Sequence, residues 1–500
     1  MDGSTIIYDS ELFTQIANDT ARIPVCKIRI YFDAPIGTQE YTKYDYIKDV
    51  NILIENSVES NFPFGNISSN ECIITLKNTD RIFSVNNTTS PLYNYLVPDL
   101  KVEVFLGFVY ENKEIYTHAG VYWTNKWISP SDSVITTLYC YDILSRIGSL
   151  NLPKLTIPDK TNFYEVFDSL FIAIGLKREQ YKIDNYLTTF TLNNIVLQYN
   201  DVKSCLQQLA IGSLSRVYTD NLGIIRVLYM YRWKDPKYHI TEHDQIISIK
   251  NNANYNDIYD KIAVSYYIPC IEKEQVVASL NNVFIDTGTT YLTGIKFTQN
   301  CVRDILYVIF NCDSNKKLYA YIEEMDSVSI SLCIVNNGEP CAVNISVIGN
   351  YINNHELIYK LQNYNSFMQY DREITLKNSF VQSFSYAQDV ATAVLAYTED
   401  ADKIFDISIR GNPLYNLNDV VEIDDNRYGY SSLRLIINRM KYTFNGALKC
   451  ELQCQKLIYP KTYIMISPGF FAEYPYNYVD VITEDDDANS IIVINQNSIE

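Results

Sequence analysis

Short segments of alternating apolar and polar side chains, separated by turn residues, dominate the first 150 residues. The alternation is clear at residues 26–31, 52–54, 72–76 and 102–105. A period of two places one face of a strand on a core and the other face in solvent. Short strands at this spacing predict a β-barrel or a β-sandwich.

Helical periodicity is found at four places in the chain. A short amphipathic helix, capped at Ser10, carries the apolar residues Leu12, Phe13, Ile16 and Ala17. Residues 162–174 carry apolar side chains at i, i+3, i+4, i+7, i+8 and i+11, and Gly175 supplies a stop. A third helix begins at a cap on Asn200 or Asp201, and a fourth covers residues 387–397.

A β-hairpin follows the third helix, with strands at 216–218 and 224–227 around a turn that contains Asp220 and Gly223. The second helix, the third helix and this hairpin predict a small α/β domain. From residue 246 the chain alternates again, through a long stretch to about residue 352. Further strands are predicted at 404–409, 420–423, 433–437 and 448–454.

Charge and composition exclude several classes of protein. The 59 acidic residues outnumber the 41 basic ones, which gives a net charge of −18. Such a chain repels the phosphates of nucleic acids and of anionic lipids, which argues against sequence-specific DNA binding. No apolar run approaches the roughly 20 residues of a membrane span. No basic and apolar leader begins the chain, so we expect synthesis in a cytosol with reduced thiols.

One segment matches a zinc-peptidase pattern. His239, Glu242 and His243 have the spacing H-x-x-E-H, which on a helix holds zinc with two histidines while the glutamate activates water. Pro236 upstream, the β-branched residues inside and the alternation that follows predict a loop entering a strand instead. On a strand the two histidines lie roughly 13 Å apart, too far for one ion. We therefore expect solvated polar residues and no metal.

The spacing of the 11 cysteines matches neither a disulfide framework nor a catalytic site. Cys205 lies on the apolar face of the third helix, and Cys450 and Cys454 lie four apart on a strand, so all three are predicted core thiols. A hairpin loop at residues 336–338 would place Cys333 and Cys341 opposite each other, within bridging range. Free thiols remain the expectation there because the cytosol is reducing.

Aromatic residues offer a binding alternative. The chain has 43 tyrosines. Exposed tyrosines can stack on sugar rings and donate hydrogen bonds, as in a protein that binds glycans of a host surface. Trp123, Trp127 and Trp233 are assigned to packing. A glycosidase needs only two carboxylates, and no local pattern singles out a pair.

Several weak motifs occur together in one order. The sequences are Tyr41-Thr42, residues 64–71, Ser90-Pro91-Leu92-Tyr93, residues 97–102, Gly120-Val121-Tyr122, residues 138–144, residues 378–383 and Arg410-Gly411-Asn412-Pro413 before a strand. In this order they resemble the baseplate hub or tail-tip proteins of long-tailed bacteriophages and of phage-like contractile particles. The resemblance covers roughly residues 10–458, and the stretch of about 272–350 departs from it.

The resemblance implies a mainly β fold with α+β parts. It comprises a first tail-tube-like β-barrel at 1–150, a small α/β domain at 151–245, a second tube-like β-barrel at 246–271 and 351–459, and an inserted β-sandwich at 272–350. Residues 460–500, rich in proline and aromatic residues around an acidic run, are expected to form a C-terminal arm that docks on a neighbour.

The implied function is structural. Such a protein forms a homotrimer at the tail tip, joins the hexameric tail tube to the threefold tip, and forms part of the DNA-ejection channel. Its partners are tail-tube, distal-tail or baseplate, and tip or spike proteins, with viral DNA only in passage. No catalytic, cofactor-binding or metal-binding residue is expected. The alternatives are a tip protein that contacts glycans of the host surface and a zinc peptidase or cell-wall hydrolase.

Overall fold

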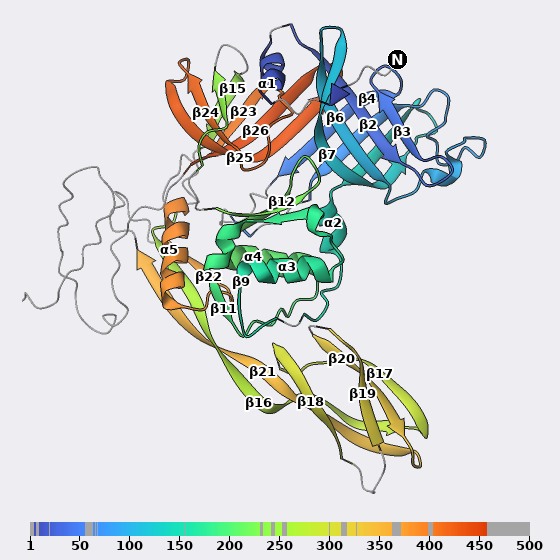
Figure 1. The fold of residues 1–500 in the computed structure, drawn as a ribbon, viewed down its shortest axis with the longest axis vertical. Coiled ribbons are helices and arrows are strands. Elements are labelled where there is room, and N and C mark those ends of the chain that lie inside the picture. Colours follow the sequence, from blue (N-terminus) through green and yellow to red (C-terminus); the bar gives the residue numbers. More distant parts are fainter. Residues whose placement is uncertain are drawn as a thin grey trace, which may run out of the picture. The chain divides into compact units, whose positions relative to one another are not determined.

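Fourteen strands, from the N-terminal third, the middle and the last hundred residues of the sequence, form one continuous sheet (Figure 1). The computed structural model describes residues 5–6, 10–19, 21–55, 64–65, 67, 69–155, 157–230, 234–241, 246–252, 258–299, 301–311, 318–326, 328–362, 372–398 and 404–457. The predicted C-terminal arm, Trp233, Glu242 and His243 lie outside these residues.

The first β unit consists of eight strands and one short helix. Its main strands pair in the order β4-β5-β8-β7-β6-β2-β3, and β1 pairs with β7. The sequence predicts the helix α1 (Ser10–Asn18) and strands at 26–31, 52–54, 72–76 and 102–105, which are parts of β2, β4, β5 and β6. The strands are β1 (Thr5–Ile6), β2 (Ile23–Tyr31), β3 (Thr38–Thr42), β4 (Ile47–Glu55), β5 (Glu71–Lys77), β6 (Lys101–Tyr110), β7 (Lys113–Ile128) and β8 (Ile135–Tyr141), with a 3₁₀ turn at Tyr93–Tyr95.

The second β unit lies almost entirely near the end of the sequence. Its strands pair in the order β15-β23-β26-β25, while β24 pairs with β25 and β14 pairs with β24. The predicted strands are all present, but the one expected at 433–437 extends to 15 residues. The strands are β14 (Tyr238–Thr241), β15 (Ile246–Asn252), β23 (Ile404–Arg410), β24 (Val420–Asp425), β25 (Tyr430–Phe444) and β26 (Leu448–Lys456).

The two β units share strand pairing and one apolar core. The end of β25 pairs with β4, so the sheet of the second unit continues into the first instead of returning on itself. Side chains of both units belong to the same buried cluster. Among the described strands no sheet closes, so the structure is mainly β as predicted but contains no closed barrel where two were expected.

The helices gather around a second core. Four of them pack with two small sheets, in the orders β10-β13-β12 and β11-β9. The elements are α2 (Ile143–Gly148), α3 (Phe163–Ala173), α4 (Val202–Gly212), α5 (Phe384–Thr398), β9 (Lys160–Asn162), β10 (Tyr181–Ile183), β11 (Thr191–Asn193), β12 (Ser215–Thr219) and β13 (Ile225–Tyr229), with 3₁₀ turns at Arg178–Gln180 and Asn185–Thr189.

Three of these helices and the hairpin match the sequence prediction. The side chain of Asn162 caps α3 by accepting from Glu165 N, and Asp201 caps α4 by accepting from Ser204 N. The apolar positions predicted for α3 are buried, from Phe163 to Phe171. The hairpin pairs Val217 with Val227 in antiparallel register. None of the described helices is long and apolar enough to span a membrane.

A long two-stranded ribbon connects the helical core to a distal β region (Figure 1). It pairs β16 (Lys261–Ile285) with β21 (Cys341–Gln362). The ribbon belongs to a sheet in the order β18-β21-β16-β22, and a second sheet has the order β17-β20-β19. The other strands are β17 (Gly288–Lys296), β18 (Val302–Asn311), β19 (Leu318–Met325), β20 (Ser329–Asn336) and β22 (Glu373–Lys377).

The two distal sheets enclose a third apolar core. Buried side chains come from both sheets, among them Val277 of β16, Ile295 of β17, Leu332 of β20 and Ile345 of β21. The near ends of β16 and β21 instead contribute to the helical core. The residues predicted for a second barrel, 246–271 and 351–459, are therefore divided between two different sheets.

Asp142 gives the fold a pH dependence. It is fully buried at the start of α2, where its carboxylate accepts a hydrogen bond from Ser145 N at 3.1 Å. Desolvation raises the pKa of the Asp142 carboxyl from 3.8 to about 6. Hydrogen bonds to the carboxylate lower this pKa, but their effect is the smaller one. Between pH 4 and pH 6 the unfolded chain loses this proton first, so stability falls as the pH rises through that window and stays low above it.

We expect Asp142→Asn to raise the free energy of unfolding at pH 7 by about 1–3 kcal/mol and to flatten its change between pH 4 and pH 6. Asparagine caps a helix about as well as aspartate, so the cap is kept while the buried charge is removed. Urea unfolding at several pH values measures both effects. A variant whose stability keeps the pH profile of the parent chain would contradict this origin.

Candidate functional site

The seam between the two β units is the first candidate site, because it joins the two units of one chain by direct strand pairing. Met440, Tyr442 and Phe444 of β25 pair with Ile54, Ile52 and Val50 of β4, in that order. All six side chains are buried. We call these six residues the seam.

Tyr442 ties the seam to a loop of the second β unit. Its hydroxyl donates to the carbonyl oxygen of Asn412 at 2.9 Å. Its ring is 1% exposed, and full burial raises the pKa of its phenol well above the ordinary value. The side chain therefore acts as a neutral donor inside the sheet. The sequence predicts the strand but not its partner, since β4 lies almost 400 residues away.

A buried arginine joins the helical region to the second β unit. Arg216 of β12 is 3% exposed, and its Nη1 donates to Asn418 Oδ1 at 2.6 Å and to Asn438 Oδ1 at 2.7 Å. Asn438 in turn donates to Gln455 Oε1 of β26 at 2.9 Å. We call Arg216, Asn418 and Asn438 the clamp. Burial, and then the charge of Arg216, lower the pKa of the nearby Lys234 to about 8.

A cavity of about 620 Å³, lined by apolar and charged side chains, lies close to the clamp, since Leu417 and Asp419 on either side of Asn418 line it. Its lining includes the basic residues Lys182, Arg226 and Lys237 and the acidic residues Asp184, Asp220 and Asp419. Four of these residues form two ion pairs within the wall, Arg226 with Asp220 at 2.6 Å and Lys237 with Asp419 at 3.0 Å. Because the charges balance and are largely paired, the cavity favours no class of charged ligand.

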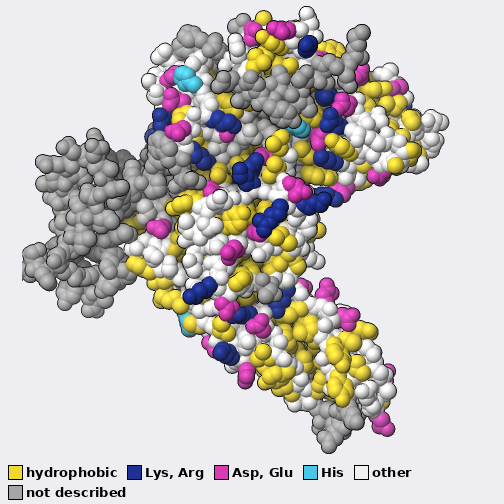
Figure 2. Space-filling model, in the orientation of Figure 1, with side chains coloured by type: hydrophobic (Ala, Val, Ile, Leu, Met, Phe, Trp, Pro, Cys, Tyr) yellow, Lys and Arg dark blue, Asp and Glu magenta, His cyan; other side chains and the backbone are white. Residues whose placement is uncertain are grey.

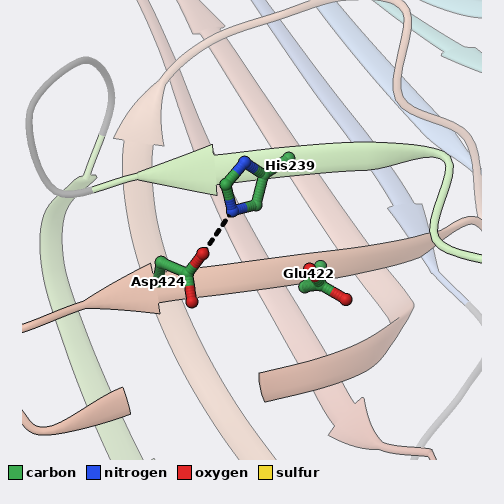
Figure 3. Close-up of side chains that lie close together, drawn as sticks. All are labelled: His239, Glu422 and Asp424. Atoms are coloured by element: carbon green, nitrogen blue, oxygen red, sulfur yellow. Dashed lines mark hydrogen bonds and ion pairs between the residues drawn. The ribbon is translucent and has the colours of Figure 1, made fainter. Parts of the chain in front are cut away.

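His239 lies on the strand β14, where a loop entering a strand is predicted; it does not lie on a helix, as expected. Across the parallel pairing with β24 it meets two carboxylates, those of Glu422 and Asp424 (Figure 3). The potential ligand atoms of these three residues lie within 4.8 Å of one another. Sequence spacing misses this group because His239 lies more than 180 positions from the two carboxylates.

Each member of this group already has a partner in the protein. His239 Nε2 lies 2.5 Å from Asp424 Oδ2, and Ser432 N donates to Asp424 Oδ1 at 2.6 Å. The Ser432 amide, and then His239, lower the pKa of the Asp424 carboxyl below its ordinary value. Glu422 accepts from Arg434 Nε at 3.1 Å. The arrangement is a solvent-exposed hydrogen-bonded cluster that links β14, β24 and β25.

The core thiols are placed as predicted. Cys205 lies on α4 and Cys450 and Cys454 lie on β26, and all three are buried and free. Desolvation raises the pKa of each thiol well above its ordinary value. A thiol held in its neutral form is a poor nucleophile, which agrees with a packing role.

The hairpin predicted at residues 336–338, which would place Cys333 opposite Cys341, is wrong. Cys333 on β20 pairs with Tyr291 and Tyr321, while Cys341 on β21 pairs with Ile285 in the other distal sheet. The chain crosses from one sheet to the other at residues 337–340 instead of folding back as a hairpin. Both thiols are free.

The described tryptophans have packing positions, as expected. Trp127 is 8% exposed in the core of the two β units, and its indole donates to the carbonyl oxygen of Val97 at 3.3 Å. Trp123 is partly buried against the helical core, and the guanidinium of Arg146 lies over its ring.

Comparison of this chain with known proteins finds similarity among solved structures. No protein-family model matches the chain. No curated protein matches it in sequence. Among solved structures it resembles the 43 kDa tail protein of prophage MuSo2 from Shewanella oneidensis, with 9% identity and a TM-score of 0.49 over 86% of this chain and 98% of that one.

Two further structures are of the same kind. A tail protein from Neisseria meningitidis has 8% identity and a TM-score of 0.49, over 87% of this chain and 96% of that one. A prophage tail protein from Listeria monocytogenes has 9% identity and a TM-score of 0.43, over 86% and 94%. The chain is similar to phage tail proteins.

Proposed function

We propose that this chain is a structural protein of the tail tip or baseplate hub of a phage or phage-like particle. In this proposal three copies surround the tail axis, join the hexameric tail tube to the threefold tip, and form part of the DNA-ejection channel. The protein is made in the cytoplasm of the host bacterium and works in the virion tail without catalysis, cofactor or metal.

The seam is the observation that carries this proposal. Because β25 pairs directly with β4, each chain holds two β units in one continuous sheet. Three such chains around an axis would present six β units, which suits an adapter between sixfold and threefold assemblies. Among the described strands, β3 and β15 at the two ends of the main strand order each pair on one side only, and neighbouring copies would meet there by strand pairing or packing.

The candidates for chemistry support a structural role. Three of the cysteines considered as candidates are buried core thiols, namely Cys205, Cys450 and Cys454. Cys333 and Cys341 are free thiols in the distal sheets. His239, the first residue of the zinc-peptidase pattern, lies on a strand. These placements leave the zinc peptidase without the helical geometry on which its mechanism depends.

The test is the state of assembly of the full chain. Light scattering of the purified protein, alone and with tail-tube protein, is expected to give three times the mass of the 500-residue chain and a complex with the tube. Direct imaging of that complex should show three copies in a ring. A monomer at all concentrations that does not bind tail-tube protein would overturn the proposal.

A further inference from the structure

A second cavity, of about 420 Å³, lies at the helical core between the start of α5 and the strand β11. Two hydrogen bonds hold its two sides together. Gln382, just before α5, accepts from Asn193 N at 2.7 Å through its Oε1 and donates to Asn193 O at 3.0 Å through its Nε2. Because these bonds join segments 189 positions apart, the cavity is a fixed feature of the tertiary structure.

Aromatic rings form one wall of this cavity. Phe163, Phe190, Phe380 and Tyr386 line it, and the ring centroids of Phe190 and Tyr386 lie 5.0 Å apart. Phe190 is partly exposed while the other three are buried, so its ring is the part of the wall that a ligand reaches most easily. The face of an aromatic ring carries negative potential and attracts a cation.

A carboxylate without a partner faces the same cavity. Of the described residues that line it, Asp389 of α5 alone is charged. Within the described part of the chain its carboxylate makes no hydrogen bond and no ion pair. The residue as a whole is exposed, and partial desolvation of the carboxyl raises its pKa above the ordinary value. The cavity therefore has a negative charge that no neighbouring side chain balances.

The surroundings of Asp389 also favour a cation. The larger cavity close to the clamp differs, because ion pairs balance the charges in its wall. On the face drawn in Figure 2, Lys and Arg side chains gather mainly where the large sheet borders the helices, and the side chains over α5 are mainly hydrophobic or uncharged. The chain as a whole carries −18, which adds to the attraction.

The lining suits an organic cation better than a metal ion. Calcium takes about six to eight oxygen ligands, whereas here one carboxylate lies beside an aromatic wall. A primary ammonium or guanidinium group on an alkyl chain fits both features. It pairs with Asp389 while its alkyl chain packs on Phe190, and the hydroxyls of Thr189 and Ser385, which line the same cavity, can accept its remaining hydrogen bonds.

From these observations we propose that this cavity binds an organic cation, with a primary ammonium or guanidinium group paired to Asp389 against the ring of Phe190. Two sources supply this chemistry, a lysine or arginine side chain of another tail protein and a free polyamine. The inference goes beyond the hub role and does not depend on a trimer, since the cavity lies at the helical core of one chain.

Ligand-observed NMR titrations of the full chain test the proposal with defined probes. The cations are the Nα-acetyl methylamides of lysine and arginine, and spermidine. The controls are the same derivatives of norleucine, which lacks the ammonium group of lysine, and of glutamate, which is an anion. We expect at least one cation to bind with a Kd on the order of 1 mM, and both controls to bind at least about tenfold more weakly.

The two sources are distinguished by comparing the probes whose binding depends on Asp389. Tighter binding of the lysine or arginine derivative assigns the site to a protein side chain. Tighter binding of spermidine assigns it to a free polyamine. Either result supports a site for an organic cation, and the choice between them does not require any other tail protein.

Matched variants make the result specific. Asp389→Asn keeps the shape of the side chain, and removing its charge should weaken cation binding by about tenfold or more. Asp132→Asn removes the same charge from an exposed position between β7 and β8 and should leave the affinity within about twofold. Phe190→Leu keeps an apolar side chain without the ring and should weaken binding by about threefold. Thermal unfolding of both asparagine variants should match that of the parent chain, since both residues are exposed.

Three results would overturn the proposal. One is that no cationic probe binds, and another is that the norleucine derivative binds as tightly as the lysine derivative. The third is that Asp389→Asn weakens binding no more than Asp132→Asn, because binding then reflects the overall charge of the chain. The mass of the assembly, measured on the same variants, reports separately on the hub proposal.

Discussion

Replacing Tyr442 with alanine is expected to lower the free energy of unfolding by about 3–5 kcal/mol, the range for removing a large buried aromatic ring. The side chain is 1% exposed at the seam, so truncation leaves a cavity between the two β units. It also removes the donor to the carbonyl oxygen of Asn412. Urea unfolding followed by circular dichroism measures the loss, and light scattering should show fewer assembled copies.

Two neighbouring variants separate the causes. Tyr442→Phe keeps the ring and removes only the hydroxyl, so about 1–2 kcal/mol should be lost. Tyr428→Ala removes a tyrosine that is 53% exposed beside β25 and should cost at most about 1 kcal/mol. If Tyr442→Ala unfolds at the same urea concentration as Tyr428→Ala, the seam does not hold the two units together.

Replacing Arg216 with alanine is the second large change, with an expected loss of about 3 kcal/mol or more. The guanidinium donates to two amide oxygens at 2.6 Å and 2.7 Å, and both are buried with it. Removing the arginine leaves these acceptors without that donor inside the protein, where water does not replace it cheaply. The same change should raise the pKa of Lys234, because the charge of Arg216 contributes to its lowering.

Arg226→Ala is the matched control for the clamp. Arg226 lies on the adjacent strand of the same hairpin and pairs with Asp220 at 2.6 Å, but its side chain is 28% exposed. An ion pair with this access to solvent should contribute at most about 1 kcal/mol. Equal losses for the two arginine variants, measured by urea unfolding at one pH, would contradict the special role of the clamp.

Local sequence patterns were sufficient to predict many of the helices and strands of this protein. The helix α3 follows from apolar spacing, the cap at Asn162 and the stop at Gly175, all within 14 residues. The strands β2, β4 to β6 and β23 to β26 follow from alternation. The β-branched residues beside His239 argue correctly against a helix there, although the prediction was a loop and the structure has a strand. Each of these signals acts between near neighbours in the chain, where side-chain direction depends on backbone period alone.

Association between the elements was decided by the tertiary structure. The pairing of β25 with β4, the clamp at Arg216 and the meeting of His239 with Asp424 all join residues that are far apart in sequence. An alternating strand carries no mark of its partner, since backbone hydrogen bonds are the same for every sequence. The separation of Cys333 from Cys341 has the same cause. A turn sequence indicates that the chain changes direction, but it does not indicate the sheet in which the next strand pairs. That sheet is the one whose buried face the strand completes.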